Sequence, residues 1–367
     1  MKRRQSGLSD KLNNVMFFLA GVLTMVIIGI LAVGIRTMAQ NNRDTNQDYQ
    51  TASSERQEPQ KKPAKESWET EKAESNSTLG GEKWAEGVIE HDGHKYKYNT
   101  DQKIYLLMGI DNDGKVEPAK DSVSGGQSDA MFLLVADDAN RQMKIVSINR
   151  NTMTEIAVCD ETGRSMGNME AQICVQHGFG DGMKLSCTRT VKAVSDMFYN
   201  LPISGYITFN LGAIKSINNV VGGVQVEVLQ DMKNAQGDVL KKGDIVTLTD
   251  DEAYLYLRGR DLTEFGSATD RLRRQEQYIN NYIMTVKGSS GVSRTKVESI
   301  YSALEDYMVT SVDFTELVSS LIEYEYTEDD MYTVPGETKK GDKFEEYYID
   351  DDEFVDMILE VFYKEVD

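Results

Sequence analysis

Hydrophobic residues gather in short, nearly continuous runs in the middle of the chain. Three such runs cover residues 103–110, 130–136 and 143–148. Runs of this length and composition are typical of β-strands that are buried on both faces. Two further strands are predicted at residues 206–210 and 224–229. The central part of the chain therefore contains a predicted β-sheet.

Apolar residues at helical spacing separate and follow these runs. The predicted helices cover residues 186–199, 211–221, 271–287, 297–308, 314–322 and 352–362. Strands that alternate with helices indicate an α/β domain in which helices pack on a mixed sheet. Ligands of open α/β sheets collect beyond the carboxyl ends of the strands. Asp111 and Arg150 each follow a predicted strand, so both are candidate site residues.

The apolar segment near the N-terminus is of another kind. Residues 16–35 form an uncharged run of 20 residues, which as a helix would span about 30 Å, the thickness of a bilayer core. Basic residues are concentrated before it, and they favour the cytoplasmic side. We therefore predict a cytoplasmic tail at residues 1–15 and a single-pass anchor in the cell membrane, with the remainder outside. A cleaved signal peptide is the alternative, but this run exceeds the usual length.

The anchor is followed by a polar segment. Residues 36–100 are rich in Gln, Asn, Glu, Lys and Ser and have little apolar periodicity, which predicts a disordered extracellular linker. His91 and His94 lie here without a Cys or third His nearby, so no metal site is expected from them. The main α/β domain is predicted at residues 101–292, and a helical, acidic C-terminal extension at residues 293–367.

Net charge narrows the possible ligands. The 367 residues include 40 basic and 60 acidic side chains, a net charge of −20. Residues 1–36 hold five basic side chains and one acidic, which leaves 35 basic and 59 acidic, or −24, for the rest. An exterior this acidic repels phosphate backbones and argues against nucleic acid as the main ligand.

Arginines are nevertheless concentrated at one place. Residues 256–275 contain five arginines and only three acidic residues. Arg258 and Arg260 are two positions apart, so on an extended segment they would point the same way. Arg271 and Gln275 are one helical turn apart and would share a face. Clustered guanidiniums suit a phosphate or pyrophosphate. The alternative is an arginine–carboxylate network that only fixes the loop.

Two aspartates complement these arginines. Asp111 and Asp129 each adjoin a predicted strand. Aspartates beside a polyphosphate are a common way to hold Mg²⁺. Taken singly, each aspartate is also typical of a turn or a helix cap. Arginines and two aspartates at one sheet edge would form a metal-assisted phosphoryl-transfer site.

The chain has three cysteines: Cys159, Cys174 and Cys187. An exported domain could oxidise one pair, and Cys174–Cys187 is the pair we expect, across a Gly-rich loop. The remaining thiol is expected to be buried, because no His–Cys spacing supports a nucleophile.

These motifs, taken in order, resemble the LytR–CpsA–Psr family of cell-wall glycopolymer transferases, found mainly in Gram-positive bacteria. The matching segments are LLMGID (106–111), SDAM (128–131), VSINRNT (146–152), VGGV (221–224), RGR (258–260) and RLRRQ (271–275). The resemblance covers about residues 103–287, and the anchor and polar linker also fit the family's usual layout.

The resemblance implies a fold, an activity and a site. The fold would be a three-layer α-β-α sandwich with an apolar pocket for a lipid tail. The activity would be transfer of a sugar-1-phosphate glycopolymer, such as a teichoic acid, from a polyprenyl-pyrophosphate carrier to peptidoglycan. Asp111 and Asp129 would hold Mg²⁺ or Mn²⁺. The pyrophosphate would be bound by Arg150, Arg258, Arg260, Arg271 and Gln275, with Arg274 assisting; Asp111, Arg150, Arg258 and Arg260 would carry catalysis.

The sequence departs from the family pattern in two segments of the site, and the segment from Asn112 to Ser128 lacks the arginine that often precedes Ser-Asp. The family's usual Pro-Arg-Asp is Asn149-Arg150-Asn151 here, and Asn151 cannot act as a general base or as an anionic metal ligand. A non-catalytic surface receptor or regulator that binds lipid-linked glycans is therefore the alternative function. Turnover of the donor pyrophosphate would distinguish the two.

Overall fold

The computed structural model describes residues 87–366, apart from residues 235, 262 and 289–293. The predicted cytoplasmic tail, the anchor and most of the linker lie outside the described residues. Among the helices that are described, none is both long and apolar enough to cross a membrane.

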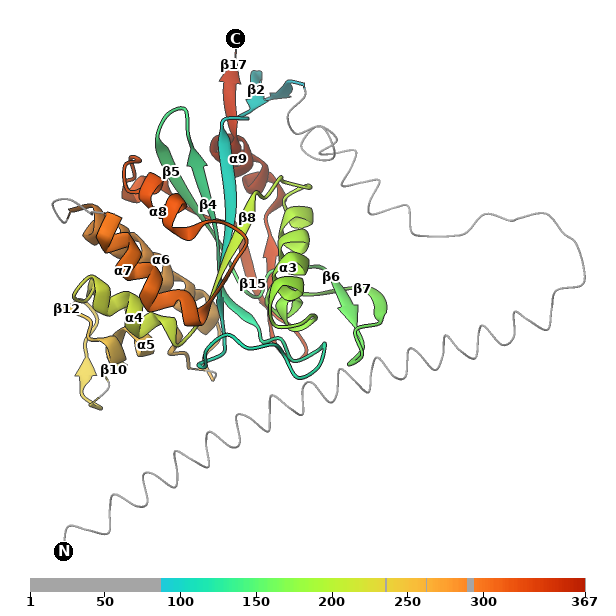
Figure 1. The fold of residues 1–367 in the computed structure, drawn as a ribbon. Coiled ribbons are helices and arrows are strands. Elements are labelled where there is room, and N and C mark those ends of the chain that lie inside the picture. The colour runs from blue at the N-terminus through green and yellow to red at the C-terminus, as the bar shows by residue number, and fades with distance from the viewer. Residues whose placement is uncertain (1–86, 235, 262, 289–293, 367) are drawn as a thin grey trace, which may run out of the picture. The chain divides into compact units, whose positions relative to one another are not determined.

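A six-stranded sheet forms the centre of the described chain, with the strand order β13-β8-β3-β4-β5-β14 (Figure 1). Its strands are β3 Gln102–Ile110, β4 Ser128–Asp137, β5 Gln142–Ile148, β8 Gly205–Asn210, β13 Met308–Thr310 and β14 Met331–Thr333. Strand β3 pairs parallel with β8 and antiparallel with β4. The mixed sheet predicted from the apolar runs is confirmed.

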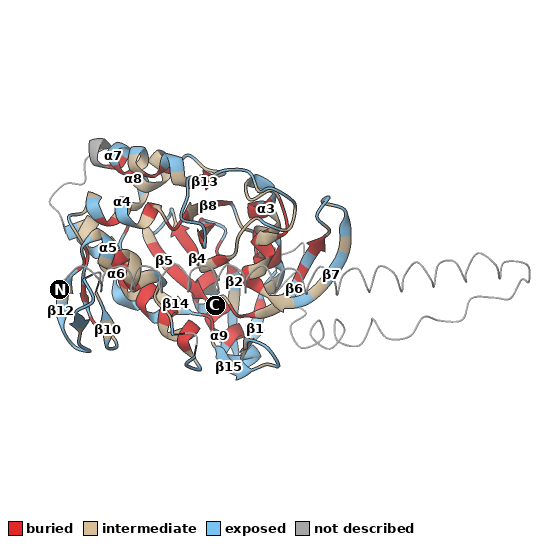
Figure 2. Ribbon diagram, turned by 90° about the horizontal axis from the view of Figure 1, so that it is seen from below, coloured by how far each residue is buried: buried red, intermediate tan, exposed pale blue. Residues whose placement is uncertain are grey.

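Helices cover both faces of this sheet. On one face, α3 (Lys184–Met197) and α9 (Asp351–Phe362) share a core with the strands, in which Val194 and Ile358 pack with Leu106. On the other face lie α6 (Ser267–Gly288) and α8 (Phe314–Leu321). The strands between the helices are mostly buried, as Figure 2 shows. Burial on both faces explains why their sequences are almost uniformly apolar.

Shorter elements surround the sheet. The remaining helices are α4 Ala213–Val220, α5 Asp250–Arg258 and α7 Arg294–Leu304, with 3-10 turns η1 Ile173–Gly178, η2 Glu305–Tyr307 and η3 Glu328–Asp330. The described residues also form four two-stranded ribbons. Two of them pair β6 Met153–Cys159 with β7 Ser165–Gln172 and β9 Gln225–Glu227 with β12 Ile245–Thr247. The other two pair β10 Met232–Lys233 with β11 Val239–Leu240 and β15 Gly336–Lys340 with β16 Glu345–Ile349. The strand predicted at 224–229 therefore lies outside the central sheet.

The folded region begins earlier than its sequence suggests. Strands β1 (Ile89–His91) and β2 (His94–Tyr98) lie within the predicted linker, and β2 pairs with β17 (Tyr363–Val366) near the C-terminus. His91 Nε2 lies 2.8 Å from an oxygen of Asp356. The prediction of disorder is wrong for residues 89–98, because strand pairing with a distant segment stabilises a polar sequence.

The C-terminal part is an integral part of the domain. Strand β13 forms one edge of the central sheet and β14 forms the other. Helix α9 buries most of one face, including Phe354 and Phe362. The predicted boundary at residue 292 and the predicted all-helical extension are therefore wrong. Strands of three residues are too short to show a period in the sequence.

The three cysteines are free and buried, so the predicted Cys174–Cys187 disulfide is wrong. Each thiol of that pair has another neighbour. Cys174 Sγ accepts a hydrogen bond from Arg150 Nη2 at 2.8 Å, and Cys187 Sγ lies 3.3 Å from Thr208 Oγ1. Burial raises the pKa of Cys187 to about 11, so its thiol is protonated at neutral pH.

Candidate functional site: an arginine cluster around Asp129

Asp129 lies at the centre of a buried ionic cluster. Its Oδ1 accepts a hydrogen bond from Arg150 Nη1, and its Oδ2 accepts one from Arg271 Nη1 at 2.8 Å. The side chains of Asp129, Arg150 and Arg271 are only 14%, 15% and 6% exposed. Charges this well buried are costly unless they are paired, which points to a specific arrangement.

The sheet and one helix bring these three residues together. Strands β4 and β5 pair antiparallel, with Met131 opposite Ile148. Asp129 lies two residues before Met131 and Arg150 two residues after Ile148, so both lie at the same end of this strand pair. Helix α6 packs on the sheet through Leu272 and places Arg271 against the same edge. The structure thus brings together three residues that the sequence motifs had assigned to one site.

Arg260 adds a third guanidinium to this cluster. Burial and then the positive charge of Arg150 lower the pKa of Arg260, so the two guanidiniums lie close enough to repel each other. Burial also lowers the pKa of Arg271, and the positive charges of Arg150 and Arg260 lower it further. An anion placed between the three guanidiniums would relieve this repulsion.

Unused hydrogen-bond donors support the same interpretation. Arg150 Nε, Arg260 Nε and Arg271 Nη2 are buried, and none has a hydrogen-bond partner in the described part of the chain. Buried donors without partners are rare in folded proteins and call for an explanation. We name Arg150, Arg260 and Arg271, together with Asp129, the arginine cluster. Its free donors suit a ligand with several oxygen acceptors.

Asp111 lies beside the arginine cluster at the end of β3. Burial and then the negative charge of Asp129 raise the pKa of Asp111, while Arg150 and Arg258 act in the opposite direction. One carboxylate oxygen accepts a hydrogen bond from the Gln127 backbone N–H at 2.7 Å. The negative charges of the two carboxylates therefore act on each other.

The turn that carries Gln127 depends on a glycine. Gly126 has a φ of +81°, and a Cβ at this position would lie 2.8 Å from a methyl group of Ile110 and 3.0 Å from the Asp111 carboxylate. A side chain here would collide with both neighbours and strain the backbone. The local fold thus keeps the Asp111 carboxylate in place.

The pKa of Asp129 is shifted in the opposite direction from that of Asp111. Burial alone would raise the pKa of Asp129, but Arg150 and Arg271 outweigh burial and lower it. Both of its oxygens are held by guanidiniums. Asp129 is therefore ionised at neutral pH, and a cation would have to share its oxygens with Arg150 and Arg271.

Arg258 lies at the Asp111 side of the site. It is the last residue of α5, its Nη1 donates to the Tyr254 hydroxyl, and it lies 3.5 Å from an Asp113 oxygen. Arg258 and Arg260 do not share one extended segment, because Arg258 is the last residue of a helix, which begins at the capping box of Thr249 and Glu252. Arg258 and Arg260 consequently approach different aspartates.

Arg274 and Gln275 do not join the arginine cluster. Arg274 is 2% exposed, and its Nε donates to the Tyr256 carbonyl at 2.8 Å while its Nη2 donates to the Gly259 carbonyl. Gln275 Nε2 donates to the Leu257 carbonyl at 3.2 Å. Both side chains bind carbonyls at the end of α5, and Arg274 Nη1 is buried without a hydrogen-bond partner among the described residues. Their predicted contact with pyrophosphate stays a prediction. Arg273, by contrast, is 66% exposed.

Several neighbours of the site had no signal in the sequence. Arg150 Nη2 also donates to Gln127 Oε1 and to Cys174 Sγ. Asn151 is 3% exposed, and its Oδ1 accepts from Gln172 Nε2 at 3.1 Å. Asn151 is thus bound within the fold rather than facing the arginine cluster. Glu345 also reaches the cluster, on the side of Arg260.

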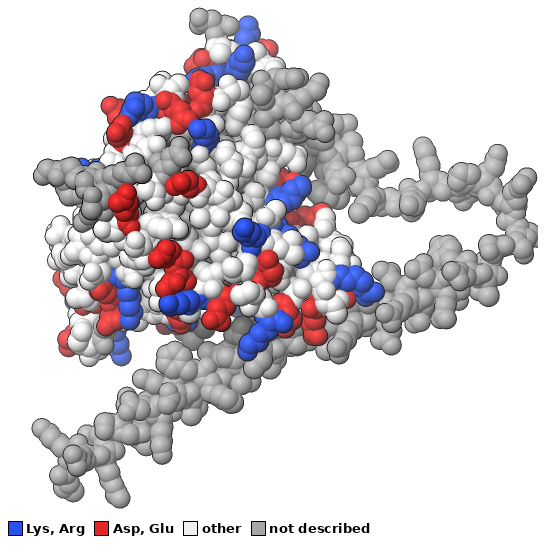
Figure 3. All heavy atoms as spheres, viewed as in Figure 1, with Lys and Arg blue, Asp and Glu red and all other residues white. Residues whose placement is uncertain are grey.

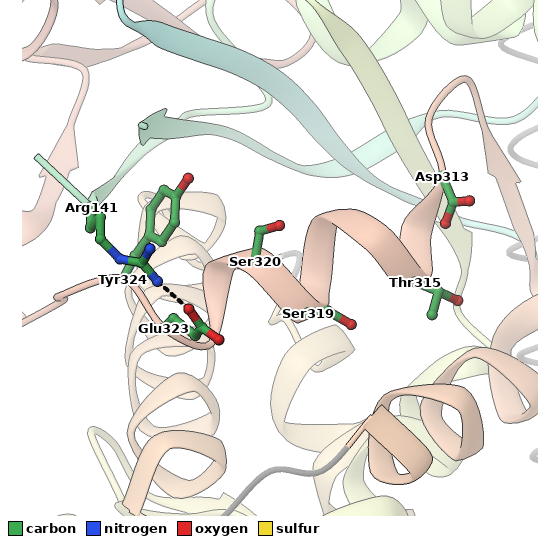
Figure 4. A pocket seen from close by; sticks show the side chains of 7 residues that line it. All are labelled: Arg141, Asp313, Thr315, Ser319, Ser320, Glu323 and Tyr324. Atoms are coloured by element: carbon green, nitrogen blue, oxygen red, sulfur yellow. Dashed lines mark hydrogen bonds and ion pairs between the residues drawn. The ribbon is translucent and has the colours of Figure 1, made fainter. Parts of the chain in front are cut away.

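A separate pocket of about 510 Å³ lies beside α8 (Figure 4). Its lining residues are Arg141, Asp313, Thr315, Ser319, Ser320, Glu323 and Tyr324. Arg141 points to Glu323 across the pocket, and the lining is largely polar. None of these residues belongs to the arginine cluster, and this pocket is not the apolar lipid pocket that the resemblance implies.

Metal binding at the site would depend on few protein ligands. Throughout residues 87–366, as far as they are described, no group of three or more His, Cys, Asp or Glu side chains could hold a metal ion. Asp111 and Asp129 can offer a cation two carboxylates. The remaining ligands would come from water and from phosphate oxygens, which is usual for Mg²⁺.

The site differs in character from the surface. In Figure 3, acidic and basic side chains are interspersed on one face of the molecule, and exposed pairs of this kind contribute little. The arginine cluster is buried and has unused donors beside two carboxylates. Fold and site together define an α/β protein with a buried cluster of guanidiniums whose charge suits a polyanion.

The family follows from the sequence comparison. The LytR_cpsA_psr family model matches residues 46–360, which include every residue of the arginine cluster. The chain therefore belongs to the LytR_cpsA_psr family.

Two relatives carry enzyme names. Polyisoprenyl-teichoic acid–peptidoglycan teichoic acid transferase TagU of Bacillus anthracis is 30% identical over 250 residues, which cover 67% of this chain and 73% of TagU. The enzyme of the same name from Bacillus subtilis, TagV, is 27% identical over 197 residues, or 52% of this chain. The match spans 46% of the length of TagV.

Solved structures share the fold. The crystal structure of B. subtilis TagV superimposes with a TM-score of 0.54 at 25% identity, over 70% of this chain and 94% of that one. Protein gbs0355 of Streptococcus agalactiae gives a TM-score of 0.55 at 19% identity, over 71% of this chain and 87% of that one. The mixed α/β fold is therefore that of the family.

Proposed function

We propose that this protein transfers a glycopolymer from a polyprenyl-pyrophosphate carrier to peptidoglycan. The observation that carries the proposal is the arginine cluster with its three buried, unpartnered donors. TagU and TagV are named as transferases that join teichoic acid to peptidoglycan, and this supports a glycopolymer transferase role. A pyrophosphate is the part of such a donor that fits clustered guanidiniums.

The arginine cluster would act mainly by binding charge. Arg150, Arg260 and Arg271 would hold the pyrophosphate oxygens, and Arg258 would approach from the Asp111 side. In the reaction, the acceptor hydroxyl oxygen forms a bond to the phosphorus that carries the glycan. The bond from that phosphorus to the bridging oxygen breaks, polyprenyl phosphate leaves, and the hydroxyl proton passes to solvent. Guanidiniums fixed in a buried site stabilise the charge that develops on the phosphate oxygens.

Asp111 and Asp129 are the residues that would hold Mg²⁺ or Mn²⁺ in this proposal. When bound, such a cation neutralises phosphate charge. Burial and then the negative charge of Asp129 raise the pKa of Asp111, and a bound cation would favour its ionised form. Arg150 and Arg271 keep the Asp129 carboxylate ionised and oriented.

The proposed place of action is the outer face of the cell membrane. This rests on the apolar run at residues 16–35 and on the basic residues that precede it, both of which lie outside the described part of the structure. The donor lipid and the peptidoglycan acceptor would then be on the same side as the site.

A double substitution tests the proposal. Arg258→Ala with Arg260→Ala removes two guanidiniums of the site, neither of which donates to a backbone carbonyl. We expect transfer from a polyprenyl-pyrophosphate donor to fall by at least about 100-fold, with the protein still folded by circular dichroism. The exposed Arg273→Ala is the matched control. Transfer at the wild-type rate by the double variant would refute the proposed function.

The same assay addresses the receptor alternative. A receptor that only binds lipid-linked glycans leaves the donor pyrophosphate intact, even with Mg²⁺ and peptidoglycan present. Release of polyprenyl phosphate by the wild-type protein would exclude that role. The position of Asn151 gives no support to the receptor, because its side chain is bound to Gln172 within the fold.

A further inference from the structure

Nη2 of Arg150 has two hydrogen-bond acceptors, the side chains of Gln127 and Cys174. It donates to Gln127 Oε1 and, at 2.8 Å, to Cys174 Sγ. A terminal guanidinium nitrogen has two N–H bonds, so these two contacts use both of them. Nη1 of the same guanidinium donates to Asp129 Oδ1. Both terminal nitrogens of Arg150 are thus held by the protein, whereas its Nε is buried without a partner among the described residues.

Cys174 is fixed firmly beside Arg150. It lies in the 3-10 turn η1 and is 0% exposed. Its backbone N–H donates to the Arg150 carbonyl at 3.2 Å, and its own carbonyl accepts a hydrogen bond from Ser128 Oγ at 3.3 Å. Ser128 directly precedes Asp129 in the chain. Cys174 therefore joins the segment that carries Arg150 to the strand that carries Asp129.

The thiol of Cys174 is a neutral acceptor. Burial raises the pKa of Cys174 and outweighs the opposite influence of Arg150, so the thiol is protonated at neutral pH. The carboxylate of Asp129 fixes the same guanidinium through a negative charge, which also repels phosphate oxygens. A neutral acceptor fixes the guanidinium without this repulsion.

We propose that Cys174 is a positioning residue, whose thiol holds the guanidinium of Arg150 in the orientation that binds pyrophosphate. The inference rests on the proposed function, since it assumes that Arg150 contacts the donor pyrophosphate. A guanidinium that is fixed before the ligand arrives loses less conformational freedom on binding. The alternative is that Cys174 only fills space, as buried free cysteines commonly do.

Three substitutions of Cys174 separate the two roles. Cys174→Ser keeps an acceptor, Cys174→Ala removes it, and Cys174→Val removes it without leaving a cavity. If Cys174 only fills space, serine should be no better than alanine, because a hydroxyl is harder to bury than a methyl group. If the thiol holds Arg150, serine should preserve pyrophosphate binding, and both apolar residues should weaken it.

The experiment measures binding of inorganic pyrophosphate to the full-length protein in detergent by calorimetry, with circular dichroism as the check of folding. We expect Cys174→Ala and Cys174→Val to weaken binding by about fivefold, and Cys174→Ser to stay within about twofold of wild type.

Cys159→Ala is the matched control for these variants. Cys159 is also 0% exposed, and its thiol also accepts a hydrogen bond from a guanidinium, Nη1 of Arg189 at 3.2 Å. Arg189 does not belong to the arginine cluster. This control should therefore bind pyrophosphate as the wild type does.

An Arg150→Lys background tests whether Cys174 acts through Arg150. Lysine keeps a positive charge for Asp129 but has no Nη2, so Cys174→Ala should have no further effect on pyrophosphate binding there. Wild-type binding by Cys174→Ala or Cys174→Val, serine no better than alanine, or equal weakening in both backgrounds would overturn the inference and leave the proposed function intact. If the wild-type protein bound no pyrophosphate, the proposed function itself would fail.

Discussion

Arg271 and Arg274 lie one helical turn apart on α6, yet their guanidiniums bind different kinds of partner. Arg271 donates to the Asp129 carboxylate and retains a free Nη2 in the arginine cluster. Arg274 donates to two backbone carbonyls and packs over the Tyr256 ring, with 5.9 Å between guanidinium carbon and ring centroid. We call Arg274, Tyr256 and Gly259, which these contacts join, the α5–α6 joint. Arg271 thus belongs to an ionic cluster and Arg274 binds the backbone, although each keeps one buried nitrogen without a hydrogen-bond partner among the described residues, Nη2 of Arg271 and Nη1 of Arg274.

The comparison shows that arginines of one dense sequence motif can bind different kinds of acceptor. Both residues are almost fully buried and both belong to the same short motif. What distinguishes them is the acceptor: a carboxylate shared with other arginines in one case, and carbonyls that end a helix in the other. The α5–α6 joint supports the arginine cluster indirectly, because Gly259 precedes Arg260.

The largest expected effect is on activity in the arginine cluster. Arg271→Ala should lower transfer from a polyprenyl-pyrophosphate donor by about 100- to 1000-fold, because it removes a donor from the charge that develops during the reaction. The measurement is kcat/KM with purified donor and peptidoglycan. Arg273→Ala on the exposed side of α6 is the control and should stay within about twofold of wild type. Equal losses of transfer in Arg271→Ala and Arg273→Ala would contradict a specific role of the arginine cluster.

The next effect is on stability in the α5–α6 joint. Arg274→Ala leaves the Tyr256 and Gly259 carbonyls without their donor and opens a buried space, so the free energy of unfolding should fall by about 2–4 kcal/mol. Denaturant titration of the full-length protein in detergent checks this. Transfer per folded molecule should fall much less than in Arg271→Ala. If Arg274→Ala instead stayed stable and lost transfer, Arg274 would belong to the binding site after all.

The smallest effect concerns Asp111 and pH. Since the folded-state pKa of Asp111 lies above its ordinary value of 3.8, its ionisation opposes folding at neutral pH. Asp111→Asn should therefore stabilise the protein at pH 7, and the gain should vanish as the pH falls through the folded pKa towards 3.8. The Asp111 carboxylate is partly desolvated, but the residue as a whole is exposed to solvent, so we expect only a few tenths of a kcal/mol.

Thermal unfolding in EDTA at pH 7 and pH 4 measures this gain. The charged neighbours that could change it are Asp129, Arg150 and Arg258, all of which remain in the variant. The same variant should lose transfer in Mg²⁺. A variant that is less stable than wild type at pH 7 would show that the Asp111 carboxylate supports the fold rather than the site.

The fold was predictable where burial leaves a clear pattern. Strands β3, β4 and β5 are apolar on both faces and appear as continuous runs. Strands β13 and β14 have three residues each, and β2 is polar because only one of its faces packs. Their places in sheets are decided by pairing partners far away in the chain, which no local pattern contains.

The site was predictable to the extent that it lies at strand ends. Asp111 and Arg150 follow apolar strands, and the arginine-rich motif pointed to Arg260 and Arg271. Helix α5 could have been found from Thr249 and Glu252, whose spacing forms a capping box. Glu345 had no such signal, since it lies on a polar ribbon whose contact with the Gly266 backbone no local pattern contains. The carbonyl contacts of Arg274 and Gln275 could not be predicted, because charge and spacing do not reveal which acceptor a buried donor meets.

The central claim is that the arginine cluster binds a polyprenyl pyrophosphate. Mass spectrometry of lipids that copurify with the full-length protein from bacterial membranes tests it most directly, with Arg271→Ala as the comparison. Our account predicts a polyprenyl-pyrophosphate-linked glycan bound to the wild-type protein and at least about a tenfold lower amount on Arg271→Ala. Equal amounts on both proteins, or no pyrophosphate lipid on the wild type, would contradict it.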